Sequence, residues 1–239
     1  MAGLAGRTAL VTGASRGIGA ATARALAAAG ARVVLVSRNA EALRTLASEI
    51  GGGAIPLACD LTDMDATERM ATEVITTLGD APDVVVSNAG IFELAPLAEM
   101  SRDVFERTVQ TNLVAPFVLL RAFLQRMRAR GSGHVVTVGS IADRMVFPEN
   151  GAYSAAKYGA RAMHEVLRAE SRGSGVRATL VSPGPVDTPL WDEILEHGAG
   201  RQLPTRDVML DPAAVADAVL WVVTRDAAVN VDELRLSHA

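Results

Sequence analysis

A tyrosine and the only lysine of the chain stand four residues apart, at Tyr153 and Lys157. The sequence has 23 basic residues and only two tyrosines, so the placement of its single lysine beside one of them is unusual. Residues four apart lie on one face of a helix. An ammonium group close to a phenol favours the phenolate form, which lets the phenol exchange a proton with a carbonyl or alcohol oxygen. The pair therefore predicts acid–base chemistry on an oxygen atom of a substrate.

Two further polar residues could act beside this pair. Ser140 follows the apolar run 134–138, so its hydroxyl falls at the carboxyl end of a predicted strand and could donate to a ligand oxygen. A serine there is also a common turn residue. Asn112 lies four residues before Pro116, which lacks the N–H that the Asn112 carbonyl would accept in a helix. That carbonyl could accept from a water leading toward Lys157, or the proline could simply kink the helix.

A glycine-rich turn follows the first apolar run and opens a helical stretch, with the sequence Thr-Gly-Ala-Ser-Arg-Gly-Ile-Gly over residues 12–19. Unpaired N–H groups at a helix start attract phosphate, and glycines allow close approach of the backbone to a pyrophosphate. Tight turns use glycine for other reasons too, but the strand-before, helix-after context favours a dinucleotide site. The predicted cofactor contacts in this turn are Gly13, Ser15, Arg16, Gly17, Ile18 and Gly19.

Ser37 and Arg38 occupy the position after the second apolar run, where an acidic residue would meet a free ribose 2′-hydroxyl. A guanidinium group there makes a charge-assisted contact with a 2′-phosphate instead. Arg16 could supply a second cation. We therefore expect NADP(H) rather than NAD(H); the alternative is that either arginine is only a solvated surface side chain.

The elements that must position these residues follow from an alternation of short Val-rich runs with Ala/Leu-rich stretches. We expect strands at 8–12, 32–36, 55–58, 83–87, 134–138, 176–181 and near 229–236. We expect helices at 20–29, 40–50, 65–78, 101–130, 152–172 and 212–224. The alternation predicts an α/β fold, a single domain over residues 1–239 with a doubly wound parallel sheet. Such sheets bind ligands beyond the carboxyl ends of their strands.

Composition excludes several other classes of protein. With 49% hydrophobic and 21% charged residues, the 239-residue chain can fill one sizeable core. A net charge of −4 gives no basic surface for nucleic acid. The longest run without an acidic or basic residue, 108–120, is too short to span a membrane. The chain starts without a secretory signal, so we expect a cytoplasmic protein. One cysteine, Cys59, and four histidines supply neither a disulfide nor a metal site, so no metal is expected.

From Thr8 to about Thr188 the sequence resembles the classical short-chain dehydrogenases/reductases of the NADP-preferring type. The motifs appear in the family's order: Thr12-Gly13-x-x-x-Gly17-x-Gly19, Asp60, Asn88-Ala89-Gly90, Asn112, Ser140, Tyr153-x-x-x-Lys157, and Pro183-Gly184 through Thr188. The resemblance implies a Rossmann fold and hydride transfer between NADP(H) and a carbonyl or alcohol. It implies a catalytic tetrad of Asn112, Ser140, Tyr153 and Lys157. It implies further cofactor contacts from Tyr153 and Lys157 and from Asp60, Leu61, Asn88, Ala89, Gly90, Pro183, Gly184, Val186 and Thr188.

The predicted substrate wall consists of Phe92, Glu93, Leu94, Arg144, Met145, Phe147 and Trp191. A segment at about 188–207, with glycines at Gly198 and Gly200, resembles the family's substrate lid. The apolar wall favours a small or medium hydroxy acid, aldehyde or ketone. Arg144 could receive a carboxylate, or it could be a surface side chain, as a lone arginine more often is. Residues 229–236 differ from the glycine-rich tail of β-ketoacyl reductases and look more like hydroxy-acid and clavaldehyde-type dehydrogenases. The resemblance also implies a homo-oligomer, a dimer or a tetramer, and we expect a tetramer.

Two other functions compete with this interpretation. Gly13-x-Ser15-x-Gly17 has the form of a hydrolase nucleophile elbow, but no upstream strand can supply an oxyanion hole. Ser154-x-x-Lys157 likewise lacks the companion motifs of serine acyltransferases. A non-catalytic, NADPH-binding regulator would keep the same fold, but it would not need the complete tetrad.

Overall fold

Seven strands form one parallel sheet in the computed structural model, which describes residues 3–198 and 203–239. The strands are β1 (Thr8–Thr12), β2 (Arg32–Ser37), β3 (Ile55–Ala58), β4 (Val84–Ser87), β5 (Gly133–Val138), β6 (Val176–Pro183) and β7 (Glu233–Leu236). Their order across the sheet is β3-β2-β1-β4-β5-β6-β7. The chain therefore winds outward from β1 to β3 and then crosses back to β4, which makes a topological switch point between β1 and β4.

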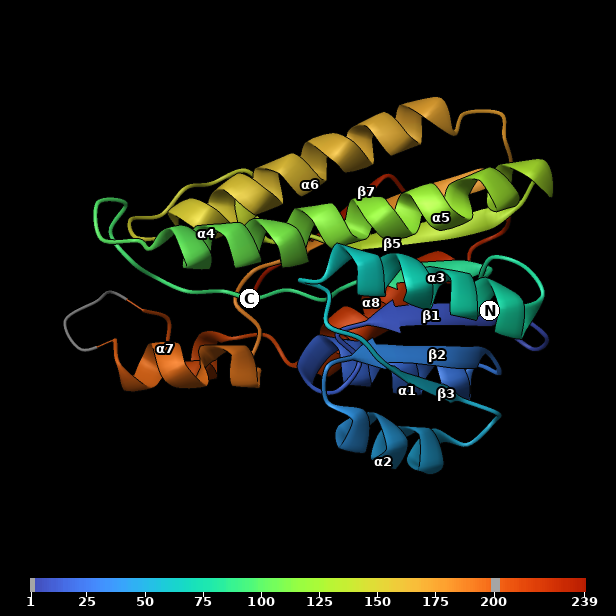
Figure 1. The fold of residues 1–239 in the computed structure, drawn as a ribbon, viewed down its shortest axis with the longest axis horizontal. Coiled ribbons are helices and arrows are strands. Elements are labelled where there is room, and N and C mark those ends of the chain that lie inside the picture. Colours follow the sequence, from blue (N-terminus) through green and yellow to red (C-terminus); the bar gives the residue numbers. More distant parts are fainter. Residues whose placement is uncertain (1–2, 199–202) are drawn as a thin grey trace.

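Helices cover both faces of this sheet (Figure 1). The helices that the structure describes are α1 (Gly17–Ala28), α2 (Ala40–Ile50), α3 (Met64–Leu78), α4 (Arg102–Val109), α5 (Ala115–Ala129), α6 (Gly151–Glu170), α7 (Asp192–Glu196) and α8 (Pro212–Val223). Of these, the short helix α7 stands apart from the sheet (Figure 1). Helices α1, α2 and α8 contribute to one hydrophobic cluster, and α3, α5 and α6 to the other. The prediction of a doubly wound parallel sheet is confirmed.

The inner strands form because their apolar runs are buried on both faces, as parallel sheets require, whereas the edge strands β3 and β7 are only partly buried. All eight residues of β6 are buried, and four of the five residues of β1 are. Polar side chains mark several helix starts: Asn39, Asp63, Ser101 and Asp211 each accept a backbone N–H from the first turn. The carboxyl ends of the strands then point to one edge of the sheet, where the loops can build a site.

The predicted helix 101–130 has three parts. A π-helical turn, Gln110–Val114, joins α4 to α5, and the Ala115 N–H donates to the Gln110 carbonyl five residues earlier. Pro116 has no N–H for the Asn112 carbonyl, so the regular α-helical pattern cannot pass through this turn. The last strand is also shorter than expected, since only Glu233–Leu236 pairs with β6. Within the described ranges, no helix is long and apolar enough to cross a membrane.

Candidate active site

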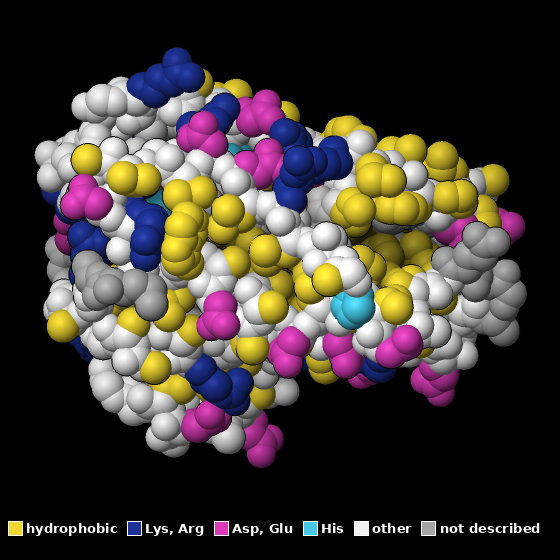
Figure 2. All heavy atoms as spheres, turned by 180° about the vertical axis from the view of Figure 1, so that it is seen from behind, with side chains coloured by type: hydrophobic (Ala, Val, Ile, Leu, Met, Phe, Trp, Pro, Cys, Tyr) yellow, Lys and Arg dark blue, Asp and Glu magenta, His cyan; other side chains and the backbone are white. Residues whose placement is uncertain are grey.

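A cleft of about 1220 Å³ lies along the carboxyl ends of the strands. It runs from the glycine turn after β1 to the start of α6, and its mouth is rimmed by hydrophobic side chains (Figure 2). The predicted residues that line it are Gly13, Ser15, Arg16, Gly17, Ile18, Ser37, Arg38, Asp60, Leu61, Asn88, Ala89, Gly90, Phe92, Glu93, Leu94, Ser140, Phe147, Tyr153, Lys157, Pro183, Gly184, Val186, Thr188 and Trp191. Four predicted site residues do not line it: Gly19, Asn112, Arg144 and Met145.

At Gly13, Gly17 and Gly19 the glycine turn leaves no room for a side chain. Gly13 and Gly17 have φ angles of +69° and +54°, the left-handed region that favours glycine. A Cβ on Gly19 would overlap the Gly13 carbonyl oxygen and lie 2.7 Å from Asn88 Nδ2. Gly19 is therefore buried beneath the cleft floor, where it allows helix α1 to start close to the strand. The resulting bare backbone at the start of α1 fits a pyrophosphate.

Thr12 fastens this turn to the loop after β4, a role that motif reading did not assign. Its Oγ1 accepts the N–H groups of Asn88 and Ala89, both at 3.0 Å. The Asn88 side chain donates in return to the Thr12 carbonyl at 2.9 Å. A polar residue at the buried end of an apolar strand is the available sequence signal, because buried hydroxyls require partners. These hydrogen bonds join the loop after β1 to the loop after β4, on either side of the switch point.

Arg16 and Arg38 lie exposed at the glycine-turn end of the cleft. Neither has a carboxylate within 4.0 Å among residues 3–198 and 203–239. Ser37, in contrast, is buried, and its Oγ accepts the Asn39 N–H at 3.2 Å. Two cations without carboxylate partners beside a cleft suit a dianionic phosphate.

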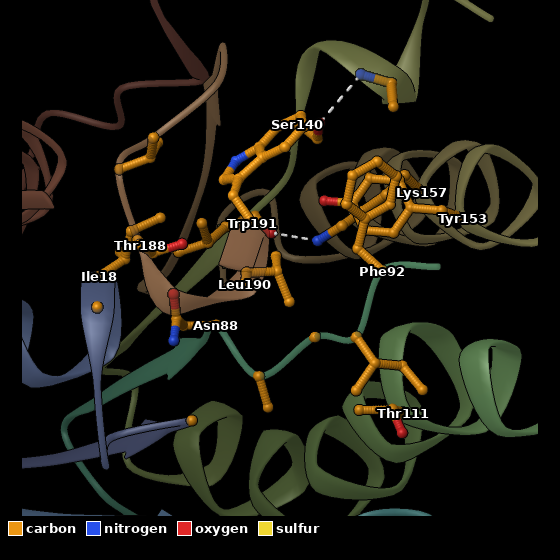
Figure 3. Close-up of a pocket in the computed structure, with 18 of the residues that line it drawn as sticks. Ile18, Asn88, Phe92, Thr111, Ser140, Tyr153, Lys157, Thr188, Leu190 and Trp191 are labelled. Atoms are coloured by element: carbon orange, nitrogen blue, oxygen red, sulfur yellow. Dashed lines mark hydrogen bonds between the residues drawn. The ribbon is translucent and has the colours of Figure 1, made fainter. Parts of the chain in front are cut away.

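Lys157 and Tyr153 lie one turn apart on α6 at the other end of the cleft (Figure 3). Lys157 is 6% exposed, and its Nζ donates to the carbonyl of Val138, the last residue of β5, at 3.0 Å. The same Nζ lies 5.5 Å from the centre of the Tyr153 ring. A buried ammonium held between helix and strand thus stands beside a phenol that faces the cleft.

Ser140 caps a short helical turn, Ile141–Asp143, directly after β5. Its Oγ accepts the Ala142 N–H at 3.1 Å. A hydroxyl that accepts one hydrogen bond keeps its proton, so Ser140 can still donate to a ligand in the cleft. Only Gly139 separates Ser140 from Val138. Ser140 and the Val138 carbonyl that Lys157 contacts therefore lie at the same end of β5.

Asn112 lies behind the cleft wall and is 3% exposed. Its Oδ1 accepts the Ile91 N–H and its Nδ2 donates to the Ile91 carbonyl, both at 2.9 Å. The side chain is therefore bound to the loop that begins with Asn88. In the structure the Asn112 side chain thus holds the loop after β4. The sequence had instead suggested a role for the main-chain carbonyl of Asn112, as the acceptor of a hydrogen bond from water.

Arg144, which was placed in the substrate wall, does not line the cleft and is not positioned there to receive a substrate carboxylate. Its guanidinium contacts Asp143 at 2.7 Å and Glu233 at 2.5 Å, outside the cleft. These contacts satisfy its charge, and Glu233 comes from β7, which sequence spacing could not place beside it. Met145 is 50% exposed and also lies away from the cleft. Of the two glycines in the predicted lid, Gly198 is described and Gly200 lies outside the described residues.

Comparison with known proteins decides the family. The family profile described as short chain dehydrogenase matches residues 7–198. The chain belongs to the short-chain dehydrogenase/reductase family. This confirms the resemblance drawn from the motifs.

Full-length relatives support the assignment. The chain is 35% identical to an uncharacterized oxidoreductase of Staphylococcus haemolyticus, over 98% of each protein. It is 36% identical to a D-threitol dehydrogenase of Mycolicibacterium smegmatis, over 97% of this chain and 91% of that enzyme. Among solved structures, a metagenomic short-chain oxidoreductase in complex with NADP superposes with a TM-score of 0.84 at 36% identity, covering 98% of both chains. This protein is therefore an oxidoreductase of that family.

Proposed function

We propose that this short-chain dehydrogenase/reductase interconverts a carbonyl compound and its alcohol, with NADP(H) as the hydride carrier. The observation that carries the proposal is that two groups share one cleft. Arg16 and Arg38, which have no carboxylate partner among the described residues, lie at one end, and the Tyr153–Lys157 pair lies at the other. When bound, the cofactor would supply or accept the hydride at its nicotinamide ring. The NADP complex of a structural neighbour supports this choice of cofactor.

The bare backbone of the glycine turn would hold the pyrophosphate, and Arg16 and Arg38 would bind the 2′-phosphate. Asp60 and Leu61 would lie at the adenine, while Asn88, Ala89 and Gly90 would support the middle of the cofactor. Four residues after β6 would flank the nicotinamide: Pro183, Gly184, Val186 and Thr188. Lys157 and Tyr153 would contact the nicotinamide ribose.

In the direction of reduction, Tyr153 would donate its phenolic proton to the carbonyl oxygen as the hydride reaches the carbonyl carbon. The ammonium of Lys157, held by the Val138 carbonyl, would stabilise the phenolate that remains. Ser140 would donate a hydrogen bond to the same oxygen and so orient the carbonyl. Asn112 would keep the loop after Asn88 in place through Ile91. In the direction of oxidation, the phenolate of Tyr153 would accept the proton of the alcohol as the hydride leaves the carbon.

We further propose that the segment at about 188–207 forms the substrate lid; its residues 199–202 lie outside the described residues. We also propose that the enzyme is a homotetramer and that it works in the cytoplasm. Large apolar side chains are exposed on the long helices, among them Phe105 on α4, Phe117 on α5 and Val166 on α6. Association of copies through these helices would cover them. Size-exclusion chromatography with light scattering measures the oligomeric state.

A fluorescence titration with NADPH and NADH tests the cofactor assignment without a known substrate. We expect NADPH to bind at least about tenfold more tightly, a difference of about 1.4 kcal/mol. Arg38→Ala should remove most of this preference by weakening NADPH binding alone, because NADH lacks the 2′-phosphate. Arg44→Ala, an exposed arginine of α2 away from the cleft, is the matched control. Unchanged NADPH affinity in Arg38→Ala would show that Arg38 does not bind the phosphate.

A further inference from the structure

We propose that the substrate is an uncharged carbonyl compound that carries an aromatic ring, or a similarly flat apolar group, next to the carbonyl. The inference rests on the proposed carbonyl chemistry at Tyr153. It concerns the walls that the reacting molecule must touch.

An aromatic wall stands beside the proposed proton donor. The ring centres of Phe92 and Tyr153 are 4.7 Å apart with the planes tilted by 55°. The ring of Trp191 meets Phe92 edge-on at 5.3 Å. The three residues come from the loop after β4, from α6 and from the turn before α7, and Figure 3 shows them gathered at one end of the cleft. A substituent on a carbonyl carbon within reach of the Tyr153 hydroxyl therefore has aromatic faces and edges as neighbours.

The rest of this end of the cleft is also mainly apolar. Its further side chains include Leu94, Ile141, Phe147, Leu190 and Leu203. A polyol would place hydroxyl groups against these surfaces, and hydroxyls buried without hydrogen-bond partners weaken binding. The wall thus differs in chemistry from the substrate named for the D-threitol dehydrogenase relative.

The charges of the described wall also disfavour an acid. Arg107 lines the cleft, but its guanidinium makes three hydrogen bonds of 3.0 Å or less with Glu93. The arginines without carboxylate partners that line the cleft, Arg16 and Arg38, stand at its opposite end. Among the described residues, this end of the cleft therefore offers a substrate carboxylate no guanidinium that lacks a carboxylate partner.

Three ketones test the inference with NADPH as reductant: methyl benzoylformate, benzoylformate, which is of similar size, and the smaller dihydroxyacetone. The first two share the ring and the ketone and differ in charge, while the third is a small neutral polyol ketone. We expect kcat/KM for methyl benzoylformate to exceed each of the others by at least about 100-fold. Equal or faster reduction of the acid or of dihydroxyacetone would overturn the inference, as would failure to reduce any of the three. Failure to bind NADPH as well would overturn the proposed function.

Trp191→Ala locates the preference in the structure. We expect kcat/KM for methyl benzoylformate to fall by at least about tenfold, with NADPH affinity within about twofold of the original. Trp221→Ala removes the other tryptophan, which is 42% exposed on α8 and packs on Arg225, and should leave both values unchanged. An unchanged kcat/KM in Trp191→Ala would contradict the assigned wall.

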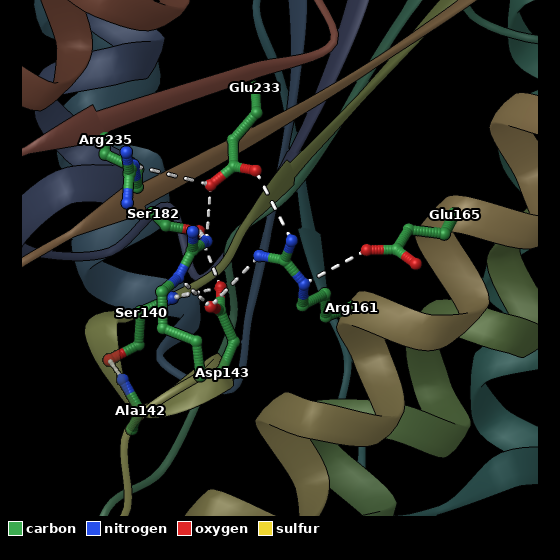
Figure 4. A network of polar contacts seen from close by, with 9 residues as sticks. Ser140, Ala142, Asp143, Arg161, Glu165, Ser182, Glu233 and Arg235 are labelled. Carbon is green, nitrogen blue, oxygen red and sulfur yellow. Dashed lines mark hydrogen bonds and ion pairs between the residues drawn. The ribbon is translucent and has the colours of Figure 1, made fainter.

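A separate observation assigns a positioning role to the buried carboxylate of Asp143, which is 1% exposed (Figure 4). Its Oδ2 accepts the Ser182 hydroxyl at 2.6 Å and the Ser140 N–H at 3.4 Å. Its Oδ1 pairs with Arg144 at 2.7 Å and with Arg161 of α6 at 3.5 Å. One side chain thus joins the turn after β5, the end of β6 and the helix that carries Tyr153.

We infer that Asp143 positions Ser140 relative to Tyr153. Arg161 lies one helical turn after Lys157 and two turns after Tyr153, so its contact with Asp143 links α6 to the Ser140 turn. Ser182 directly precedes Pro183, so the same carboxylate also holds the strand end that leads to the proposed nicotinamide contacts. Both arginines extend this network to Glu233 of β7.

A double-mutant cycle separates positioning from general stability. Asp143→Asn should lower kcat by about tenfold or more and leave NADPH affinity within about twofold, whereas in a Ser140→Ala background the same change should lower kcat by less than about threefold. If Asp143→Asn does not fold, Ser182→Ala takes its place, because it removes one contact of the carboxylate. Ser182→Ala should also lower kcat. Asp80→Asn is the control. Asp80 pairs with Arg126 and Arg130 before the amino end of β4, away from the cleft, so its loss should leave kcat unchanged. Equal effects of Asp143→Asn in both backgrounds, or no effect in either, would overturn the inference.

Discussion

Tyr153→Phe is expected to lower kcat for carbonyl reduction by about 10²- to 10⁴-fold, the usual contribution of a positioned proton donor. The change removes only the phenolic oxygen. The ring remains, and with it the packing against Phe92 at 4.7 Å. NADPH affinity should therefore stay nearly constant while turnover collapses. Steady-state kinetics with a reducible ketone, together with a fluorescence titration of NADPH, measures both quantities.

The chain supplies a matched control in its other tyrosine. Tyr158 is on the same helix, directly after Lys157, but it is 41% exposed and does not line the cleft. Tyr158→Phe should leave kcat and NADPH affinity unchanged. If Tyr153→Phe retained full turnover, another group would be the proton donor. If the unaltered protein bound NADPH but reduced no carbonyl compound, a regulatory function would replace the enzymatic one.

Gly19→Ala is expected to raise the Kd for NADPH by about 5- to 150-fold, which corresponds to an overpacking cost of about 1–3 kcal/mol. The φ angle of Gly19 lies outside the positive range, so alanine can adopt its backbone conformation. The conflict is one of space, because the new methyl group would overlap the Gly13 carbonyl oxygen and crowd Asn88. The glycine turn or helix α1 must then move, and with it the N–H groups proposed to bind the pyrophosphate.

Gly3→Ala controls for the added methyl group itself, because a Cβ there would meet only the Ala29 carbonyl oxygen at an ordinary 3.8 Å. NADPH titration and thermal unfolding of both variants separate lost binding from lost stability. Unchanged NADPH affinity in Gly19→Ala would mean that the turn can absorb the methyl group, or that the pyrophosphate binds elsewhere.

Local sequence patterns were sufficient for the fold and for most of the cleft. The strands β1 and β3 begin and end at the predicted residues because their apolar runs are continuous. Helix α2 also has the predicted bounds, because Asn39 caps its start and Gly51 follows its end. The Tyr153–Lys157 pair needed only helical spacing, and the glycine turn needed only a strand before it and a helix after it. These features depend on neighbours within a few residues, which is why the sequence alone determines them.

The tertiary structure decided which groups those side chains contact. Asn112 reaches Ile91, Lys157 reaches the end of β5, and Arg144 meets Glu233 of β7 instead of the cleft. Each contact joins residues at least 19 positions apart, so no local period encodes it. The direction of a long polar side chain depends on the nearest charge or carbonyl once the strands are paired. The sequence by itself therefore determined the elements and the types of reactive group, and the packing of the sheet decided which of them share the cleft.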